Sequence, residues 1–176
     1  MPTIPDAITP NVERARCALL NKTGSVFWIG VGRRTAWSDE NAPPDPDPTA
    51  VAIEEPIVYV RAAFVRLAKT VTIHEDVVHL GQKYAWVADA DAITQGARWL
   101  YIKAELNPGL DGQPYHAFRQ VGIFNNLVPA TGHETDDWLA PANVASPGAI
   151  VYLCNVIARD LVEGRTEAVP VMREFR

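Results

Sequence analysis

The two histidines best placed for metal chemistry lie in the stretch HEDVVH, at His74 and His79. Zinc proteases hold their metal with two histidines at positions i and i+4 of a helix, where both imidazole rings face one ion. His74 and His79 are five residues apart, so they lie on different faces of a helix and on opposite faces of a strand. This spacing favours a solvated turn between two strands over a zinc site.

The acidic stretch HETDD, residues 133–137, is a second candidate because carboxylate oxygens bind divalent cations. A calcium-binding loop places its ligands at alternating positions around a central glycine, and this stretch lacks that arrangement. The expected structure is therefore a solvated acidic loop. A metal-dependent hydrolase built from His74, His79 and this loop is kept as an alternative.

Two glycines, Gly30 and Gly32, follow an apolar stretch as the glycines of a dinucleotide-binding loop do. The third glycine of that fingerprint is missing, and no helical pattern follows Arg33 and Arg34. The two glycines therefore indicate close packing or the end of a strand. No serine lies in a Gly-x-Ser-x-Gly elbow, so the sequence predicts no catalytic residue, no metal, no cofactor and no small-molecule substrate.

The composition fits one globular domain over residues 1–176, since 48% of the residues are hydrophobic. The 21 acidic and 16 basic residues give a net charge of -5, which makes nucleic acid a poor candidate partner. No apolar run approaches the ~20 residues of a membrane helix, and the opening MPTIPDAITP has no signal-peptide pattern, so we expect a soluble protein without a membrane partner. Cys17 and Cys154 lie in no motif and are expected to be buried thiols rather than a disulfide.

One helix is predicted over residues 9–23. Thr9 can cap this helix, Pro10 suits its first position, and Gly24 follows its end. Its apolar stripe comprises Val12, Ala15, Leu19 and Leu20.

The rest of the chain reads as strands separated by turns. Residues 25–32 form an apolar run typical of a central strand, and four of the fourteen prolines follow in the extended loop 37–48. Further strands are predicted within 57–73, 77–87, 97–106 and 116–127, and residues 129–147 are predicted to be a loop.

The last segment, residues 148–175, predicts a C-terminal β-hairpin. Its alternation places Ile150, Tyr152 and Cys154 on one face, and Pro170 requires an edge strand or a bulge. The pattern as a whole predicts a mainly β fold with one or two short helices.

Three stretches together resemble a known family. The first covers 26–46 and contains Trp28, Gly30, Gly32, Arg33, Trp37, Asp39, Glu40, Asn41, Pro43, Pro44, Asp45 and Pro46. The second covers 117–123 and contains Phe118, Arg119 and Gln120. The third is the C-terminal hairpin with Gly148, Tyr152, Asn155, Arg159, Glu167 and Phe175. In this order, the stretches are similar to those of the peripheral baseplate wedge proteins of T-even-type contractile bacteriophages, in a shortened version.

The resemblance implies a layered β-sandwich, often a homodimer, that joins neighbouring wedge proteins in the tail baseplate of a virion assembled in the host bacterial cytoplasm. It implies no catalysis and no cofactor. The alternative is a β-sandwich protein-binding module of another particle or of a contractile secretion machine.

The proline-rich loop is the predicted interaction segment. Its residues Trp37, Asp39, Glu40, Asn41, Pro43, Pro44, Asp45 and Pro46 would form a stiff arm with an acidic rim. Two alternatives stay open for Trp37, which either anchors a contact with another subunit or plugs the end of its own sandwich. Trp28 is expected in the core, and Arg159 and Glu167 are expected to pair across the hairpin.

Overall fold

The computed structural model describes residues 10–114 and 116–176, which form two compact units. The described part of the first unit is residues 10–25, 64–102 and 171–176, and the second unit holds residues 26–63 and 103–170. Because two compact units can belong to one domain, the single domain over 1–176 stays a prediction.

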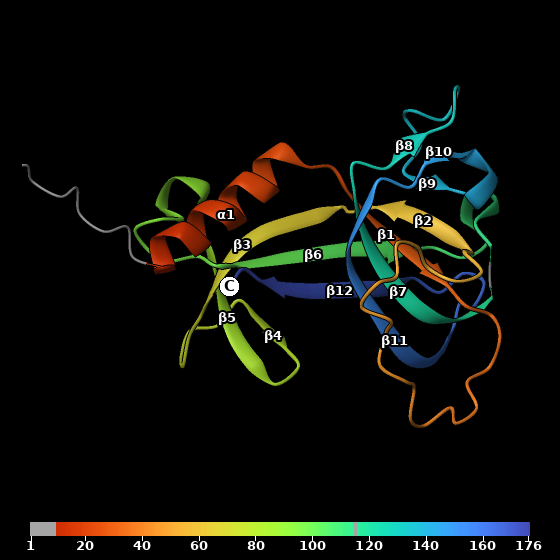
Figure 1. Ribbon diagram of the computed structural model, residues 1–176, viewed down its shortest axis with the longest axis horizontal. Helices are drawn as coiled ribbons and strands as arrows, with labels where there is room; N and C mark the ends of the chain where they lie inside the picture. Colours follow the sequence, from red (N-terminus) through yellow and green to blue (C-terminus); the bar gives the residue numbers. More distant parts are fainter. Residues whose placement is uncertain (1–9, 115) are drawn as a thin grey trace, which may run out of the picture. The chain divides into compact units, whose positions relative to one another are not determined.

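The first unit contains a helix and most of a five-stranded sheet with the order β12-β6-β3-β5-β4 (Figure 1). Its elements are α1 (Pro10–Gly24), β3 (Phe64–Thr70), β4 (Val77–His79), β5 (Gln82–Val87), the 3-10 helix η1 (Asp89–Asp91), β6 (Trp99–Leu106) and β12 (Glu167–Glu174). The boundary between the units falls within β6 and β12. β12 is an edge strand, as Pro170 requires.

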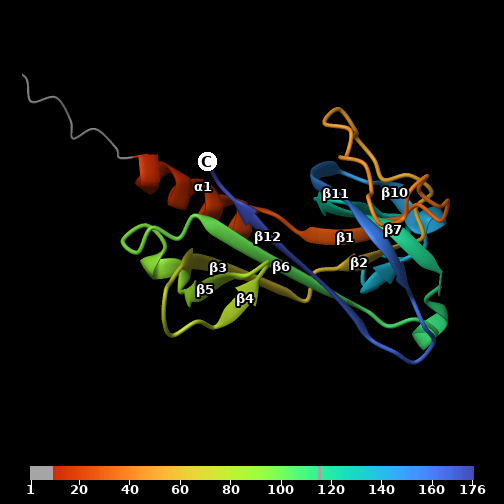
Figure 2. The same ribbon diagram turned by 90° about the horizontal axis from the view of Figure 1, so that it is seen from below.

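Helix α1 contacts strand β3 and lies beside it in Figure 1, and Figure 2 shows the helix next to the same sheet. Its contact face consists of Ala15 and Ala18, both fully buried, whose small side chains let the helix backbone approach the sheet closely. The predicted helix is confirmed, while its proposed cap Thr9 lies outside the described residues. Leu20 was wrongly placed in the apolar stripe, since it is 62% exposed. The expected burial of Cys17 was also wrong. This residue is exposed because it lies on the side of the helix away from Ala15 and Ala18.

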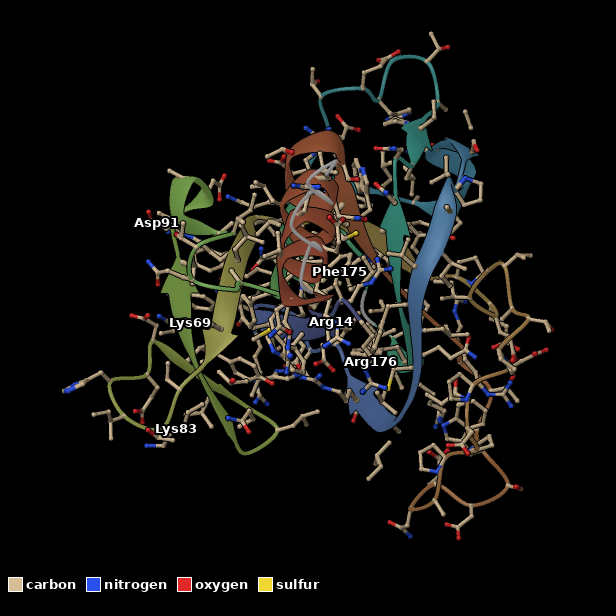
Figure 3. All side chains as sticks on the ribbon, turned by 60° about the vertical axis from the view of Figure 1, so that its left-hand side comes forward. Arg14, Lys69, Lys83, Asp91, Phe175 and Arg176 are labelled. Atoms are coloured by element: carbon tan, nitrogen blue, oxygen red, sulfur yellow. The ribbon has the colours of Figure 1, made fainter. Side chains whose placement is uncertain are left out.

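The helix and several other elements of the first unit carry charged side chains. Figure 3 labels Arg14 of α1, Lys69 of β3, Lys83 of β5 and Asp91 of η1 on their separate elements. Lys69 donates to the Gln95 amide at 2.8 Å.

The second unit contains a five-stranded antiparallel sheet with the order β11-β7-β1-β2-β9 and a two-stranded pair, β10-β8. The sheet strands are β1 (Phe27–Gly32), β2 (Val58–Arg61), β7 (Ala117–Asn125), β9 (Trp138–Leu139) and β11 (Ala149–Asp160). The remaining elements are β8 (Val128–Pro129), β10 (Val144–Ser146) and the 3-10 helices η2 (Leu110–Gly112) and η3 (Pro141–Asn143). The predicted loop 129–147 therefore contains short strands, too brief to produce an alternating pattern.

One core cluster of the second unit lies on one face of its five-stranded sheet, and Ile29, Val31 and Ile123 on the opposite face are buried as well. The cluster is formed by Trp28, Ile53, Tyr59, Phe124, Leu127 and Leu139. Gly30 lies in the middle of the cluster's face, where a Cβ atom would come within 2.8 Å of the Phe124 ring and 2.9 Å of the Tyr59 ring. The glycine pair thus serves close packing, as the sequence indicated, and Val144 of β10 packs as a partly buried residue over the same core. The mainly β, layered fold with one N-terminal helix is confirmed.

Strand β11 departs from simple alternation because its register against β7 shifts between Ile150 and Tyr152. This bulge puts Ile150 opposite Phe124 and Tyr152 opposite Ile123, whose side chains lie on opposite faces of β7. The prediction that Ile150 and Tyr152 share a face was therefore wrong.

The C-terminal strands also differ from the predicted hairpin over 148–175. Both strands are present, but β11 pairs with β7 in one sheet and β12 belongs to the other sheet. Alternation indicates that a segment is a strand without identifying its partner. Among the described residues, no helix is both long enough and apolar enough to cross a membrane.

Candidate interaction surface

The segment that joins β1 to β2, residues 33–57, carries the predicted interaction residues and begins with a tight approach of its two ends. The Arg33 backbone N–H donates to the Glu54 carbonyl at 2.6 Å, and the two side chains form an ion pair. Gly32 permits this approach because a Cβ atom there would lie 2.4 Å from the Glu54 carbonyl oxygen. The long loop is therefore closed at its base.

Glu55 holds the first turn of the loop. Its carboxylate accepts hydrogen bonds from the backbone N–H of Arg34 at 2.8 Å and from the N–H and hydroxyl of Thr35 at 2.9 and 2.6 Å. The bond from the Thr35 hydroxyl, followed by the two backbone bonds, lowers the pKa of Glu55 below its ordinary value. Each of these bonds favours the ionised carboxylate, so Glu55 anchors the turn as a charged group.

Trp37 lies against strand β11. Its side chain is 8% exposed, and its indole nitrogen donates to the Val156 carbonyl at 3.0 Å. The Arg33 guanidinium sits 3.8 Å from the centre of the ring, in a cation–π contact. Trp37 is therefore packed within its own unit, which is the second of the two alternatives. The loop does not present this aromatic side chain as an exposed anchor.

A line of amide hydrogen bonds connects β7, β11 and the loop. Gln120 of β7 is only 3% exposed; its amide oxygen accepts from the Glu54 N–H at 2.7 Å and its amide nitrogen donates to the Asn155 amide oxygen at 2.9 Å. The Asn155 amide nitrogen then donates to the Pro44 carbonyl at 2.9 Å. Amides that satisfy one another in this way, one buried and one half-buried, fix the position of the proline-rich segment.

Arg119, the neighbour of Gln120, holds the acidic part of the loop. Its guanidinium donates to Glu40 at 2.7 Å and to the Arg34 carbonyl at 2.6 Å. Residues from all three stretches of the family resemblance therefore contact one another here, although the stretches lie far apart in the chain.

We call Arg33, Trp37, Arg119, Gln120 and Asn155 the loop clamp.

The other predicted motif residues support the frame around the loop clamp or lie elsewhere. Gly148 has a φ of 70°, and a Cβ atom there would come within 2.3 Å of the Asn125 carbonyl. Arg159 forms the predicted ion pair with Glu167 and lies over the ring of Phe118. Phe175 belongs to the first unit and is not part of this surface.

The outer surface of the loop is acidic. Asp39, Asn41, Pro44 and Asp45 are exposed, while Glu40, Pro43 and Pro46 are half-buried. The second unit contains fourteen of the 21 acidic residues and only seven of the 16 basic residues. The loop therefore presents negative charge on a unit that is itself negatively charged.

The structure does not assemble a metal site from the residues that it describes. In residues 10–114 and 116–176, no group of three or more histidine, cysteine, aspartate or glutamate side chains could hold a metal ion. His79 ends strand β4, whereas His74 lies in the loop before it. His133 instead bonds Asp136 within its own turn, at 2.8 Å.

Sequence reasoning missed Glu54 and Val156, which bond residues of the loop clamp, and Glu55, which bonds Arg34 and Thr35 at the start of the loop. No spacing pattern marks them, because their partners lie 20 or more residues away.

Comparisons with known proteins identify a family and a relative of the chain. Residues 7–175 match the sequence model of a family described as baseplate wedge 3 tail fiber network component. The chain is also 34% identical over 156 residues to virion protein 3 of Enterococcus phage phiEF24C, and this match covers 85% of the chain and 84% of the relative.

Proposed function

Because the chain belongs to the family of baseplate wedge 3 tail fiber network components, we propose that it binds neighbouring baseplate subunits through the outer face of loop 38–48. It is a structural protein of the phage virion and a component of the tail baseplate. In this proposal its role is assembly, without catalysis or cofactor.

The observation that carries the proposal is the loop clamp. An exposed loop rich in proline would normally lose conformational entropy when it docks on a partner. Here Asn155 and Trp37 fix the loop to strand β11, at Pro44 and at the base of the loop. Much of the ordering cost is therefore met during folding, which suits a surface that must meet another subunit in one orientation.

The charge of the loop defines the chemistry of the partner. Asp39 and Asp45 are exposed, and the acidic balance of the second unit adds to their field. A basic surface on a neighbouring baseplate protein complements this charge, and the association should weaken as salt screens it. A second copy of the chain, as in a homodimer, is the alternative neighbour, and sedimentation of the purified protein distinguishes the two.

The test replaces charge while keeping the local hydrogen bonds. In the double variant Asp39→Asn, Asp45→Asn, the amide oxygen at position 39 can still accept the bond that the Asn41 N–H donates at 2.9 Å. We expect this variant to fold normally and to enter baseplates poorly in a complementation assay. The matched control Asp137→Asn, Asp160→Asn removes the same charge from exposed positions outside the loop and should be incorporated like wild type. Equal incorporation of both double variants would refute the proposed surface.

A further inference from the structure

A groove runs between the proline-rich loop and strand β11 in the second unit. It has a volume of about 310 Å³. Its walls are formed by Pro46, Asp47, Pro48 and Ala50 on one side and by Ile150, Val151, Tyr152 and Leu153 on the other. All the lining residues except Asp47 and Tyr152 are apolar, so the groove suits a ligand with apolar side chains.

The β11 side of the groove is the edge of the five-stranded sheet. From Ala149 to Ala158 this strand carries no charged residue, and its side chains from Ile150 to Val156 are half-buried. Edge strands of natural proteins are usually protected by charges or by covering segments. The Trp37 indole covers the carbonyl of Val156, whereas the groove lies beside Ile150 to Leu153.

The loop wall of the groove, which contains Pro46 and Pro48, does not pair with the edge of strand β11. Pro46 and Pro48 have no backbone N–H, so the loop offers few donors that could pair with the strand. The prolines also keep the wall extended, which preserves the groove as a channel along β11.

One fixed carboxylate stands in the wall. Asp47 accepts hydrogen bonds from the Thr49 N–H at 2.8 Å and from the Thr49 hydroxyl at 2.7 Å. The hydroxyl bond, followed by the backbone bond, lowers the pKa of Asp47 and keeps it ionised at neutral pH. Both bonds use Oδ1, so Oδ2 retains its acceptor capacity for a ligand.

We propose that this groove binds an extended segment of a neighbouring baseplate subunit, with its apolar side chains against Ile150 to Leu153 and a lysine or arginine paired with Asp47. The inference rests on the proposed function, since it adds a specific contact to the same face of the molecule. The negative charge of Asp47 favours a basic segment, and the uncharged edge of strand β11 favours an extended one.

The first experiment titrates the full-length protein, followed by NMR, with two synthetic pentapeptides. One has the sequence Ile-Lys-Val-Arg-Val, and the other has glutamate in place of both basic residues. We expect the basic peptide to shift the amide signals of Ala50 and of Val151 to Leu153, with an affinity about tenfold higher than that of the acidic peptide. Equal affinities, or shifts confined to other residues, would overturn the inference.

The variant Asp47→Asn separates the charge of the groove from its shape. Its amide oxygen can accept the same bonds from Thr49, so the turn is kept while the charge is removed. The tenfold preference for the basic peptide should disappear in this variant. It should persist in the control Asp137→Asn, because Asp137 is an exposed carboxylate of the same unit that does not line the groove. Loss of the preference in both variants would show a general charge effect and contradict the specific pairing.

The second experiment places a photo-crosslinking amino acid at Val151 in assembled baseplates, with a matched label at Val162, which is exposed outside the groove. Crosslinks from position 151 to a basic, extended segment of another subunit support the inference. Crosslinks to a second copy of this chain, or none, overturn it. If the loop double variant still fails to assemble in that case, the proposed function stands and only the groove contact is refuted.

Discussion

The indole nitrogen of Trp37 donates a hydrogen bond of 3.0 Å to the carbonyl of Val156, which lies 119 residues further along the chain. This bond joins the start of the proline-rich loop to the edge strand of the second unit. The sequence left two roles open for Trp37, and this bond gives the residue a structural role within its own unit. The contact residues of the proposed interface are therefore the acidic and proline residues of the loop.

Trp37→Ala should destabilise the second unit by about 3 kcal/mol, because it removes a large buried ring and opens a cavity. Chemical denaturation followed by circular dichroism measures this loss. Trp37→Phe keeps most of the ring and loses the hydrogen bond to Val156, so its cost should be smaller, about 1 kcal/mol. An alanine variant as stable as wild type would mean that the loop is held without Trp37.

Gly32→Ala should destabilise the protein by roughly 1–3 kcal/mol, because the new methyl group would meet the Glu54 carbonyl oxygen and push the base of the loop apart. Gly24→Ala is the matched control at the end of α1, where nothing lies within 4 Å of the added Cβ atom. Thermal unfolding of the two variants should differ clearly. Equal melting temperatures would contradict the close approach at Gly32.

The sequence correctly predicted the features that depend on residues within a single helix or strand. Helix α1 has a proline at its start and a glycine at its end, and the apolar run of β1 has the composition of a central strand. Strands β4 and β5 both fall within the predicted segment 77–87. These features depend on neighbours in the chain, which a single sequence displays directly.

The sequence was a poor guide where distant segments decide the outcome. The bulge in β11 comes from its pairing with β7, and the two C-terminal strands join different sheets. The loop clamp was visible only as separate motif residues, since the bond between Gln120 and Asn155 requires the register of two strands. Exposure of Leu20 likewise depends on which residues of α1 face strand β3.

Leu80→Gly should stabilise the first unit by up to about 1 kcal/mol. Leu80 and Gly81 form the two-residue turn between β4 and β5, with φ values of 47° and 79°. A side chain in this left-handed region is strained, whereas glycine adopts it freely. Leu80 is also 94% exposed, so its removal costs little packing. Thermal unfolding should show a higher midpoint for Leu80→Gly and a lower one for the control Val78→Gly, whose residue lies in strand β4.

Glu55 should make the stability of the second unit depend on pH in the acid range. The hydrogen bond from the Thr35 hydroxyl, with those from the backbone N–H groups of Thr35 and Arg34, lowers its pKa in the folded state below the ordinary value of 4.5. A lowered pKa means that the stabilisation is fully present above the unfolded-state value and is lost as the pH falls through the folded-state value. Urea midpoints measured from neutral pH downward should therefore be constant to about pH 5 and then fall.

The variant Glu55→Gln cannot ionise, so it should be less stable at neutral pH. Its urea midpoint should fall less steeply than that of the wild type below about pH 5. The control Glu163→Gln changes a carboxylate that lies beside Asn107 to Leu110, outside loop 33–57, and should keep the wild-type profile. If Glu55→Gln reproduces the acid dependence of the wild type, the carboxylate does not anchor the turn at Arg34 and Thr35 in solution.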